Sequence, residues 1–239
     1  MSLLRAMCNN EKSLEGKTIV FTGSNFPEEA AGKVEELGGQ AIYLPLIETS
    51  IRQTDKPDFT DYSWLIFTSR TSAEAFCQLH ADDVPHIAAV GEKTAEVLQN
   101  NGYRVDFIPS VYSADRFVEE FPAAADGQKC LFIKGALAKN TIANMPLPVD
   151  EWVIYDTELK LENAKALSQM KQQTIIFASP SAVSAYRKAG GDWRDIEVAA
   201  IGHVTEKAIK DAGGHIDFIP ATYTYLDVVN EIAKGRCKQ

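Results

Sequence analysis

The chain has 239 residues, 45% of them hydrophobic and 24% charged, so it can bury one large core or two smaller ones. A formal net charge of −9 without any basic run argues against binding to nucleic acid, but it permits an anionic small molecule held at helix N-termini. All apolar runs are only strand-sized, so we expect no membrane span or membrane partner, and residues 1–16 read as a leader rather than a signal peptide. The four cysteines lack metal-ligand spacing, which is typical of reduced thiols in a cytoplasmic protein: Cys8, Cys77, Cys130 and Cys237.

Short apolar runs alternate with helical patterns along the chain, which predicts βα units, parallel sheets and helices on both sheet faces. The predicted strands are residues 17–22, 40–44, 63–68, 86–90, 104–108, 129–133, 151–155, 174–178, 197–201 and 215–219. Predicted helix caps are Ser24 or Asn25, Thr71 with Glu74 as a capping box, Ser113, Ser179 before Pro180, and Thr224.

Two segments interrupt this alternation, residues 45–55 and 155–163, which are extended and polar-alternating. If residues 52–153 form one domain, the two ends of the chain combine into the other, and these segments are linker strands between them. Division of the chain near residue 124 also gives five strands to each half. The residues alone leave both divisions open.

An internal repeat is the strongest organisational feature. Residues 87–121 reappear as residues 198–232 at an offset of 111, with Gly91 matching Gly202 and Thr94 matching Thr205. Both copies carry the run Asp-Phe-Ile-Pro followed by a tyrosine. The repeat predicts two similar domains with a cleft between them.

Hydroxyl groups are concentrated after the predicted strands, where ligands of open parallel sheets bind. Those after the strands are Thr22, Ser24, Thr68, Ser69, Thr94, Ser179, Ser181 and Thr205. Helix capping explains many of them individually, but together they predict two rims of small polar groups. The chain has no GxGxxG, GxxxxGK[ST], GxSxG or HExxH motif, and its four histidines have no ligand spacing. The sequence therefore shows no motif for a nucleotide cofactor or a zinc ion.

Several segments, in this order and spacing, resemble the uroporphyrinogen-III synthase family over residues 17–233. They are LGGQAIYLPLIE (37–48), WLIFTSRTSAEAF (64–76), AAVGEKTAEVLQNNGYRVDFIP (88–109), VIYDTE (153–158), IIFASPSAV (175–183) and AAIGHVTEKAIKDAGGHIDFIP (199–220). The resemblance implies an α/β fold of two flavodoxin-like, doubly wound parallel-sheet domains joined by a two-stranded β-ladder. The implied outer domain is discontinuous, residues 1–46 plus 160–239, the inserted domain is 52–153, and the linker strands are 47–51 and 154–159.

The resemblance also implies a cofactor-free lyase of haem and tetrapyrrole synthesis that cyclises hydroxymethylbilane to uroporphyrinogen III. Tyr155 falls on the position implied to assist departure of the substrate hydroxyl. The implied substrate-binding residues are Thr68, Ser69, Gly91, Thr94, Lys134, Ser179, Ser181, Gly202 and Thr205. The chain departs from the family pattern at Gly23-Ser24, where many members have Arg-Pro, and at Lys134-Gly135, where many have Arg-Gly. Arg70 is a candidate to compensate for the lost guanidinium.

Two other functions agree less well with the sequence. A two-lobed, non-catalytic binding protein for a small anion would use the same hydroxyls, but it does not need a tyrosine on the linker strand. A receiver-type signalling module would need acidic residues at the strand ends, where this chain has Thr and Ser. We expect a monomer whose domains close around the substrate.

Overall fold

The computed structural model describes residues 13–235, and the chain divides into two compact units. The first unit runs up to Glu48 and resumes at Glu158, and the second comprises Thr49–Thr157. Cys8, Cys237 and most of the predicted leader lie outside the described residues.

The first unit is built on a parallel sheet with the strand order β2-β1-β8-β9. Its elements are β1 (Thr18–Phe21), α1 (Glu28–Glu36), β2 (Gln40–Tyr43), α5 (Leu161–Ser168), β8 (Thr174–Phe177), α6 (Pro180–Lys188), β9 (Glu197–Ala200), α7 (His203–Asp211) and α8 (Tyr225–Lys234). Beyond β9, Phe218 forms a single parallel bridge to Ala199. Counted in chain order with Phe218 as the fifth position, this is the 2-1-3-4-5 order of flavodoxin-like sheets.

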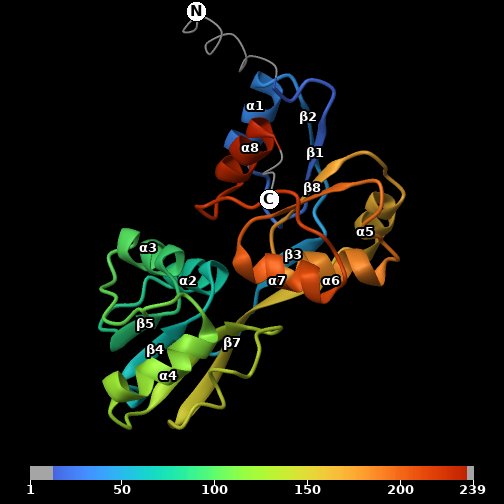
Figure 1. Ribbon diagram of the computed structural model, residues 1–239. Helices are drawn as coiled ribbons and strands as arrows, with labels where there is room; N and C mark the ends of the chain where they lie inside the picture. The colour runs from blue at the N-terminus through green and yellow to red at the C-terminus, as the bar shows by residue number, and fades with distance from the viewer. Residues whose placement is uncertain (1–12, 236–239) are drawn as a thin grey trace, which may run out of the picture. The chain divides into compact units, whose positions relative to one another are not determined.

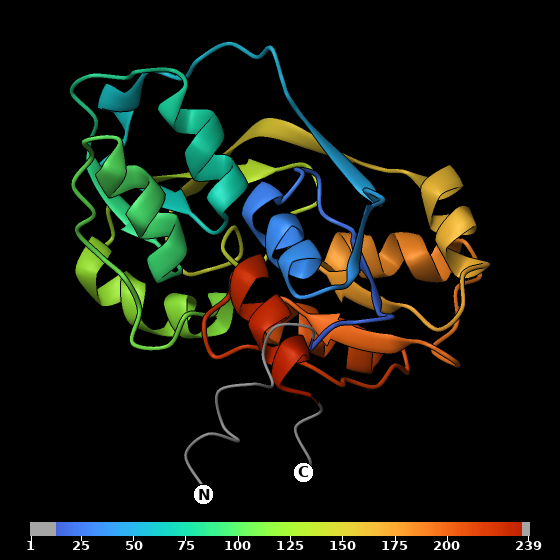
Figure 2. The same cartoon turned by 90° about the horizontal axis from the view of Figure 1, so that it is seen from above.

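Helices cover both faces of this sheet, because successive strand residues point to opposite sides and both sets are apolar. Val20 and Phe177 pack in a core with α5, α6 and α7, whereas Ile19 and Phe21 pack with α1 and α8. Figure 1 and Figure 2 both show α1, in blue, beside α8, in red, so the two ends of the described chain meet on one face. The predicted α/β class is confirmed.

The second unit has a sheet of the same arrangement, but the chain passes through its strands in a different order. Its sheet has the order β3-β7-β6-β4-β5, and Phe107 bridges Ala88 beyond β5. The elements are β3 (Ile47–Ile51), the 3₁₀ turn η1 (Phe59–Asp61), β4 (Trp64–Phe67), α2 (Arg70–Cys77), β5 (His86–Ala89), α3 (Glu92–Asn100), α4 (Ala114–Ala125), β6 (Cys130–Gly135) and β7 (Val149–Leu159). Helices α2 and α3 cover one face and α4 the other. The strands β7-β6-β4-β5 thus correspond to β2-β1-β8-β9.

The strands β3 and β7 pair at the edge of this sheet. The N–H of Arg52 donates to the carbonyl of Ile154, and the N–H of Lys160 donates to the carbonyl of Leu46. Residue numbers rise along one strand as they fall along the other in these two bonds, as expected of strands that run in opposite directions.

The strands predicted at 104–108 and 215–219 are wrong, because each reduces to one bridged residue. The following prolines, Pro109 and Pro220, have no N–H to continue a ladder. The aspartates of the repeated run replace part of the ladder with side-chain bonds. Asp106 accepts the N–H of Ile87, and Asp217 accepts that of Val198.

The predicted caps Ser113, Ser179 and Thr224 are confirmed, since each side chain accepts an N–H from the first turn of its helix. Two other cap predictions are wrong. Helix α1 begins after Pro27 without a side-chain cap, so Ser24 and Asn25 lie too early, and α2 is capped by Ser69 rather than by Thr71.

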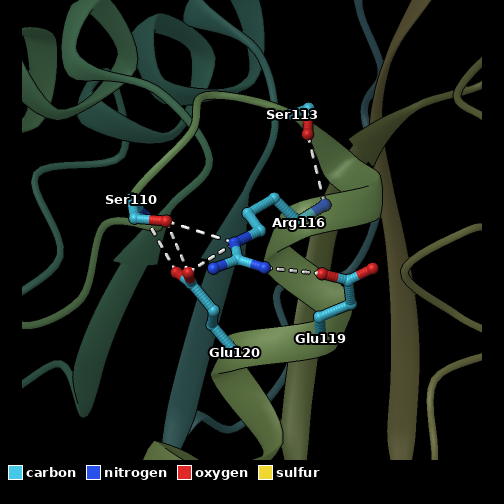
Figure 3. A network of polar contacts seen from close by, with 5 residues as sticks. All are labelled: Ser110, Ser113, Arg116, Glu119 and Glu120. Atoms are coloured by element: carbon cyan, nitrogen blue, oxygen red, sulfur yellow. Dashed lines mark hydrogen bonds and ion pairs between the residues drawn. The ribbon is translucent and has the colours of Figure 1, made fainter.

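The start of α4 is held by a network that the second copy of the repeat lacks (Figure 3). Glu120 accepts the N–H of Ser110 and pairs with Arg116, which also pairs with Glu119. The bonds from Ser110 are the main cause that lowers the pKa of Glu120. In the other copy, alanine stands at the position of Ser110 and aspartate at that of Arg116. The network therefore ties down the loop before α4 and is a local structural feature.

Cys77 and Cys130 are buried free thiols that pack in the cores of the second unit. None of the helices in residues 13–235 is long and apolar enough to cross a membrane.

Candidate functional site

Tyr155 reaches across the sheet of the second unit to the start of α2. It lies on β7, where it is paired with Gly135 of β6, and its hydroxyl is 3.2 Å from the Oγ of Ser69, which follows β4. A Cβ built on Gly135 would overlap the Tyr155 ring. The absence of a side chain at the end of β6 therefore lets the phenol cross from β7 to the helix after β4.

Ser69 is held by three hydrogen bonds at the first turn of α2. Its Oγ accepts the N–H of Ser72 at 3.1 Å, donates to the Oγ of Ser72 at 3.0 Å and contacts the hydroxyl of Tyr155. Ser72 is fully buried, and its Oγ donates to the carbonyl oxygen of Ser69 at 2.9 Å. The structure thus brings together two of the predicted site residues, Tyr155 and Ser69, and adds Ser72, which sequence reasoning missed.

Lys134 makes no contact with the group formed by Tyr155, Ser69 and Ser72. Its side chain is buried, with the ammonium paired to Glu151 on β7 and lying 5.4 Å from the ring centre of Phe132. Phe132 belongs to the α4 face of the sheet, whereas Tyr155 packs against the core of the α2 and α3 face. The charge of Lys134 is therefore satisfied within the fold. Arg70, exposed at the start of α2, pairs with Glu74 at 3.3 Å.

The starts of α3 and α7 are alike and differ from that of α2. Their N-cap residues are Gly91 and Gly202, and no described side chain caps either helix. Uncapped N–H groups and the helix dipole make such a first turn attractive to a carboxylate. Thr94 and Thr205, in the same turns, are buried, with 5% and 3% of their surface exposed.

A tyrosine lies beside each of these glycines. A Cβ built on Gly202 would lie 2.9 Å from the ring of Tyr223, and one built on Gly91 would lie 3.7 Å from Tyr112. These tyrosines are 39% and 42% exposed. Their recurrence at the offset of the repeat was the signal that could have identified them.

The remaining predicted residues lie at strand ends or in first turns. Ser179 accepts the N–H of Ala182 at 3.2 Å, Ser181 is half-buried in the first turn of α6, and Thr68 is half-buried after β4. At the end of β1, the hydroxyl of Tyr225 occupies the space that a side chain at Gly23 would need. Residues 13–235 contain no cluster of His, Cys, Asp and Glu able to hold a metal ion.

Comparison with known proteins identifies a family that shares this sequence and fold. The family model described as "Uroporphyrinogen-III synthase HemD" matches residues 28–230. Curated uroporphyrinogen-III synthases are similar: one from Chlorobaculum parvum is 26% identical, with 92% of this chain and 99% of the relative covered, and one from Synechococcus elongatus is 28% identical, with 90% and 93% covered.

Solved structures show the same fold at lower identity. The uroporphyrinogen-III synthetase of Helicobacter pylori superposes with a TM-score of 0.62 at 18% identity, covering 91% of this chain and 98% of that one. A mutant uroporphyrinogen III synthase of Thermus thermophilus gives 0.69 at 13% identity, covering 92% and 98%. Since the family model spans most of both units, the chain belongs to the uroporphyrinogen-III synthase family.

Proposed function

We propose that this protein is a lyase that converts hydroxymethylbilane into uroporphyrinogen III, in the synthesis of haem and other tetrapyrroles. The observation that carries the proposal is the family match over residues 28–230. The matched range contains Tyr155 and Ser69, whose hydroxyl groups are in contact, and the uncapped starts of α3 and α7.

The reaction removes the terminal hydroxyl of the linear tetrapyrrole as water and leaves an electrophilic azafulvene. The far pyrrole then attacks this carbon through its own substituted position and forms a spiro intermediate. Fragmentation and reclosure invert that last ring, ring D. Because hydroxymethylbilane also cyclises unaided to the type I isomer, the enzyme must chiefly position the two ends and stabilise the developing charges.

Tyr155 is proposed as the catalytic residue that donates a hydrogen bond to the departing hydroxyl. A phenol carries one O–H that can donate such a bond. Its placement at the carboxyl end of the sheet, half-buried beside the first turn of α2, supports this role.

The eight carboxylates of the substrate are proposed to bind at the first turns of α3 and α7, next to Gly91, Thr94, Gly202 and Thr205. Ser179 and Ser181 are proposed to add donors at the start of α6, and Thr68 after β4. The uncapped N–H groups of the two glycine-started helices support these assignments. Lys134 is a weaker candidate, since Glu151 already neutralises it.

We also propose the domain boundaries given by the family resemblance: an outer domain of 1–46 plus 160–239, an inserted domain of 52–153, and linkers 47–51 and 154–159. The division of the chain near Glu48 and Glu158 supports them. A monomer in the cytoplasm is the proposed working form. Its free buried thiols support a reducing compartment.

The decisive experiment incubates purified protein with hydroxymethylbilane without any added cofactor, oxidises the products and separates the isomers by chromatography. The proposal expects the type III isomer to predominate, in proportion to enzyme concentration. Only the spontaneous type I isomer would refute it.

A further inference from the structure

The two units treat the serine that follows the corresponding strands β4 and β8 differently. Ser69 follows β4 and Ser179 follows β8, and both cap the next helix by accepting the N–H of the residue three positions on. That residue is Ser72 in one unit and Ala182 in the other. Capping by itself therefore does not need the hydroxyl of Ser72, because the other unit caps with alanine at this position.

Hydrogen-bond directions follow from the number of hydrogens. A serine hydroxyl has one hydrogen and two lone pairs. Ser72 gives its hydrogen to the carbonyl of Ser69, which can only accept. It therefore accepts the hydrogen of Ser69.

The bonding capacity of Ser69 is then complete. Its one hydrogen goes to Ser72, and its lone pairs take the N–H of Ser72 and the O–H of Tyr155. Tyr155 must be the donor in its contact with Ser69. Ser179, by contrast, accepts only the capping N–H, and no group in residues 13–235 takes its hydrogen.

We propose that Ser69, fixed by Ser72, is a positioning residue for Tyr155 rather than a ligand of a substrate carboxylate, and that Ser179 alone of this pair donates to the substrate. This rests on the proposed function and on the role of Tyr155 in it. Ser69 sets where the phenol oxygen lies. When substrate is present, the O–H of Tyr155 turns about its C–O bond toward the departing hydroxyl. The hydrogen of Ser69 then turns from Ser72 to the phenol oxygen, so the contact between Ser69 and Tyr155 is kept and the ring stays beside Gly135.

The matched variants Ser69→Ala and Ser179→Ala each remove one equivalent helix cap. Ser69→Ala also removes the bonds to Ser72 and Tyr155, so it should lower the stability of the fold more than Ser179→Ala does. Their kinetics for formation of the type III isomer should differ. We expect Ser69→Ala to lower kcat about fivefold, the effect of one hydrogen bond, with KM unchanged. Ser179→Ala should instead raise KM about fivefold, because it removes a contact to bound substrate.

Combination with Tyr155→Phe separates positioning from general structural damage. Ser69→Ala should cause no further loss of kcat once the phenol hydroxyl is gone, whereas the effect of Ser179→Ala should multiply with that of Tyr155→Phe. A readout independent of activity is the ¹³C NMR signal of tyrosine labelled at Cζ, in which the Tyr155 signal among eight tyrosines is assigned by its loss in Tyr155→Phe. Ser69→Ala should shift this signal and Ser179→Ala should leave it in place.

The inference is overturned if Ser69→Ala raises KM as Ser179→Ala does, or if its effect multiplies with that of Tyr155→Phe. A Tyr155→Phe enzyme with wild-type kcat would overturn it too, since Ser69 would then position a residue without a catalytic role. If the wild-type protein yields only the type I isomer, the proposed function fails instead, and the NMR shift alone decides whether Ser69 holds Tyr155.

Discussion

The substitution Gly135→Ala tests whether the path of Tyr155 across β6 matters. The Cβ of alanine would lie 2.5 Å from Cε2 of the tyrosine ring and 2.7 Å from its hydroxyl oxygen. Carbon atoms in ordinary contact are about 3.5–4.0 Å apart, so the ring must move by about 1 Å or more. Gly135 has no left-handed φ angle, so the backbone itself accepts alanine and the collision with Tyr155 is the whole perturbation.

Such a shift takes the hydroxyl away from Ser69, from which it is now 3.2 Å distant. Overpacking of this kind costs about 1–3 kcal/mol in the free energy of unfolding. We expect kcat for type III formation to fall roughly five- to tenfold, about as far as in Tyr155→Phe. In both variants the departing hydroxyl of the substrate loses the hydrogen bond from the phenol.

The assay combines thermal or denaturant unfolding with the isomer ratio and the kinetics of the purified variant. Gly32→Ala is the matched control, since a Cβ on Gly32 meets no atom within 4 Å and alanine in α1 should stabilise by about 0.5–1 kcal/mol. A Gly135→Ala protein that unfolds like the wild type and keeps its kcat would refute the argument.

Three further outcomes are expected. Hydrogen bonds from Arg194 lower the pKa of Asp192 from 3.8 to about 2, so the ionised carboxylate stabilises the fold above pH 3.8 and this stabilisation is lost as the pH falls through about 2. The difference in melting temperature between the wild type and Asp192→Asn should therefore shrink across that window, and a constant difference would contradict the assignment. Burial raises the pKa of the Cys130 thiol to about 11, so mass spectrometry should find Cys130 unalkylated at pH 8 until the protein unfolds; rapid labelling of the folded protein would contradict this. Asp106→Ala and Asp217→Ala should each destabilise by about 1–3 kcal/mol and by similar amounts in denaturant unfolding, because each leaves a strand N–H unpaired; a several-fold disparity would show that the two copies use this aspartate differently.

The sequence predicted the fold well wherever the signal was local. Apolar runs such as residues 64–67 and 174–177 are strands at nearly the predicted bounds, because a buried parallel strand needs little more than a short apolar run. The prediction failed at 104–108 and 215–219, where an apolar run next to proline looks the same whether it pairs along its length or at one residue. That difference depends on the carboxylates of Asp106 and Asp217, whose partners are on a neighbouring strand.

The candidate site was less predictable because its contacts depend on register. Tyr155 and Ser69 were identified separately, but their contact requires a glycine at the end of β6 and a register shift between Lys134 and Gly135. Sequence patterns do not give a register of this kind. Lys134 illustrates the same limit: its position suggests a ligand for carboxylates, and its ion pair with Glu151 on a neighbouring strand could not be predicted from the sequence.

The strand β1 has a consequence for how the chain folds. It pairs with β8, joining Ile19 to Thr174, so the first unit cannot complete its sheet before the C-terminal part of the chain has been synthesised. The second unit is contiguous in sequence and can fold while the ribosome is still translating the rest. Once folded, it shortens the flexible loop that must close to bring β1 and β8 together, which lowers the entropic cost of that closure. We therefore expect the inserted unit to fold first and to ease assembly of the discontinuous one.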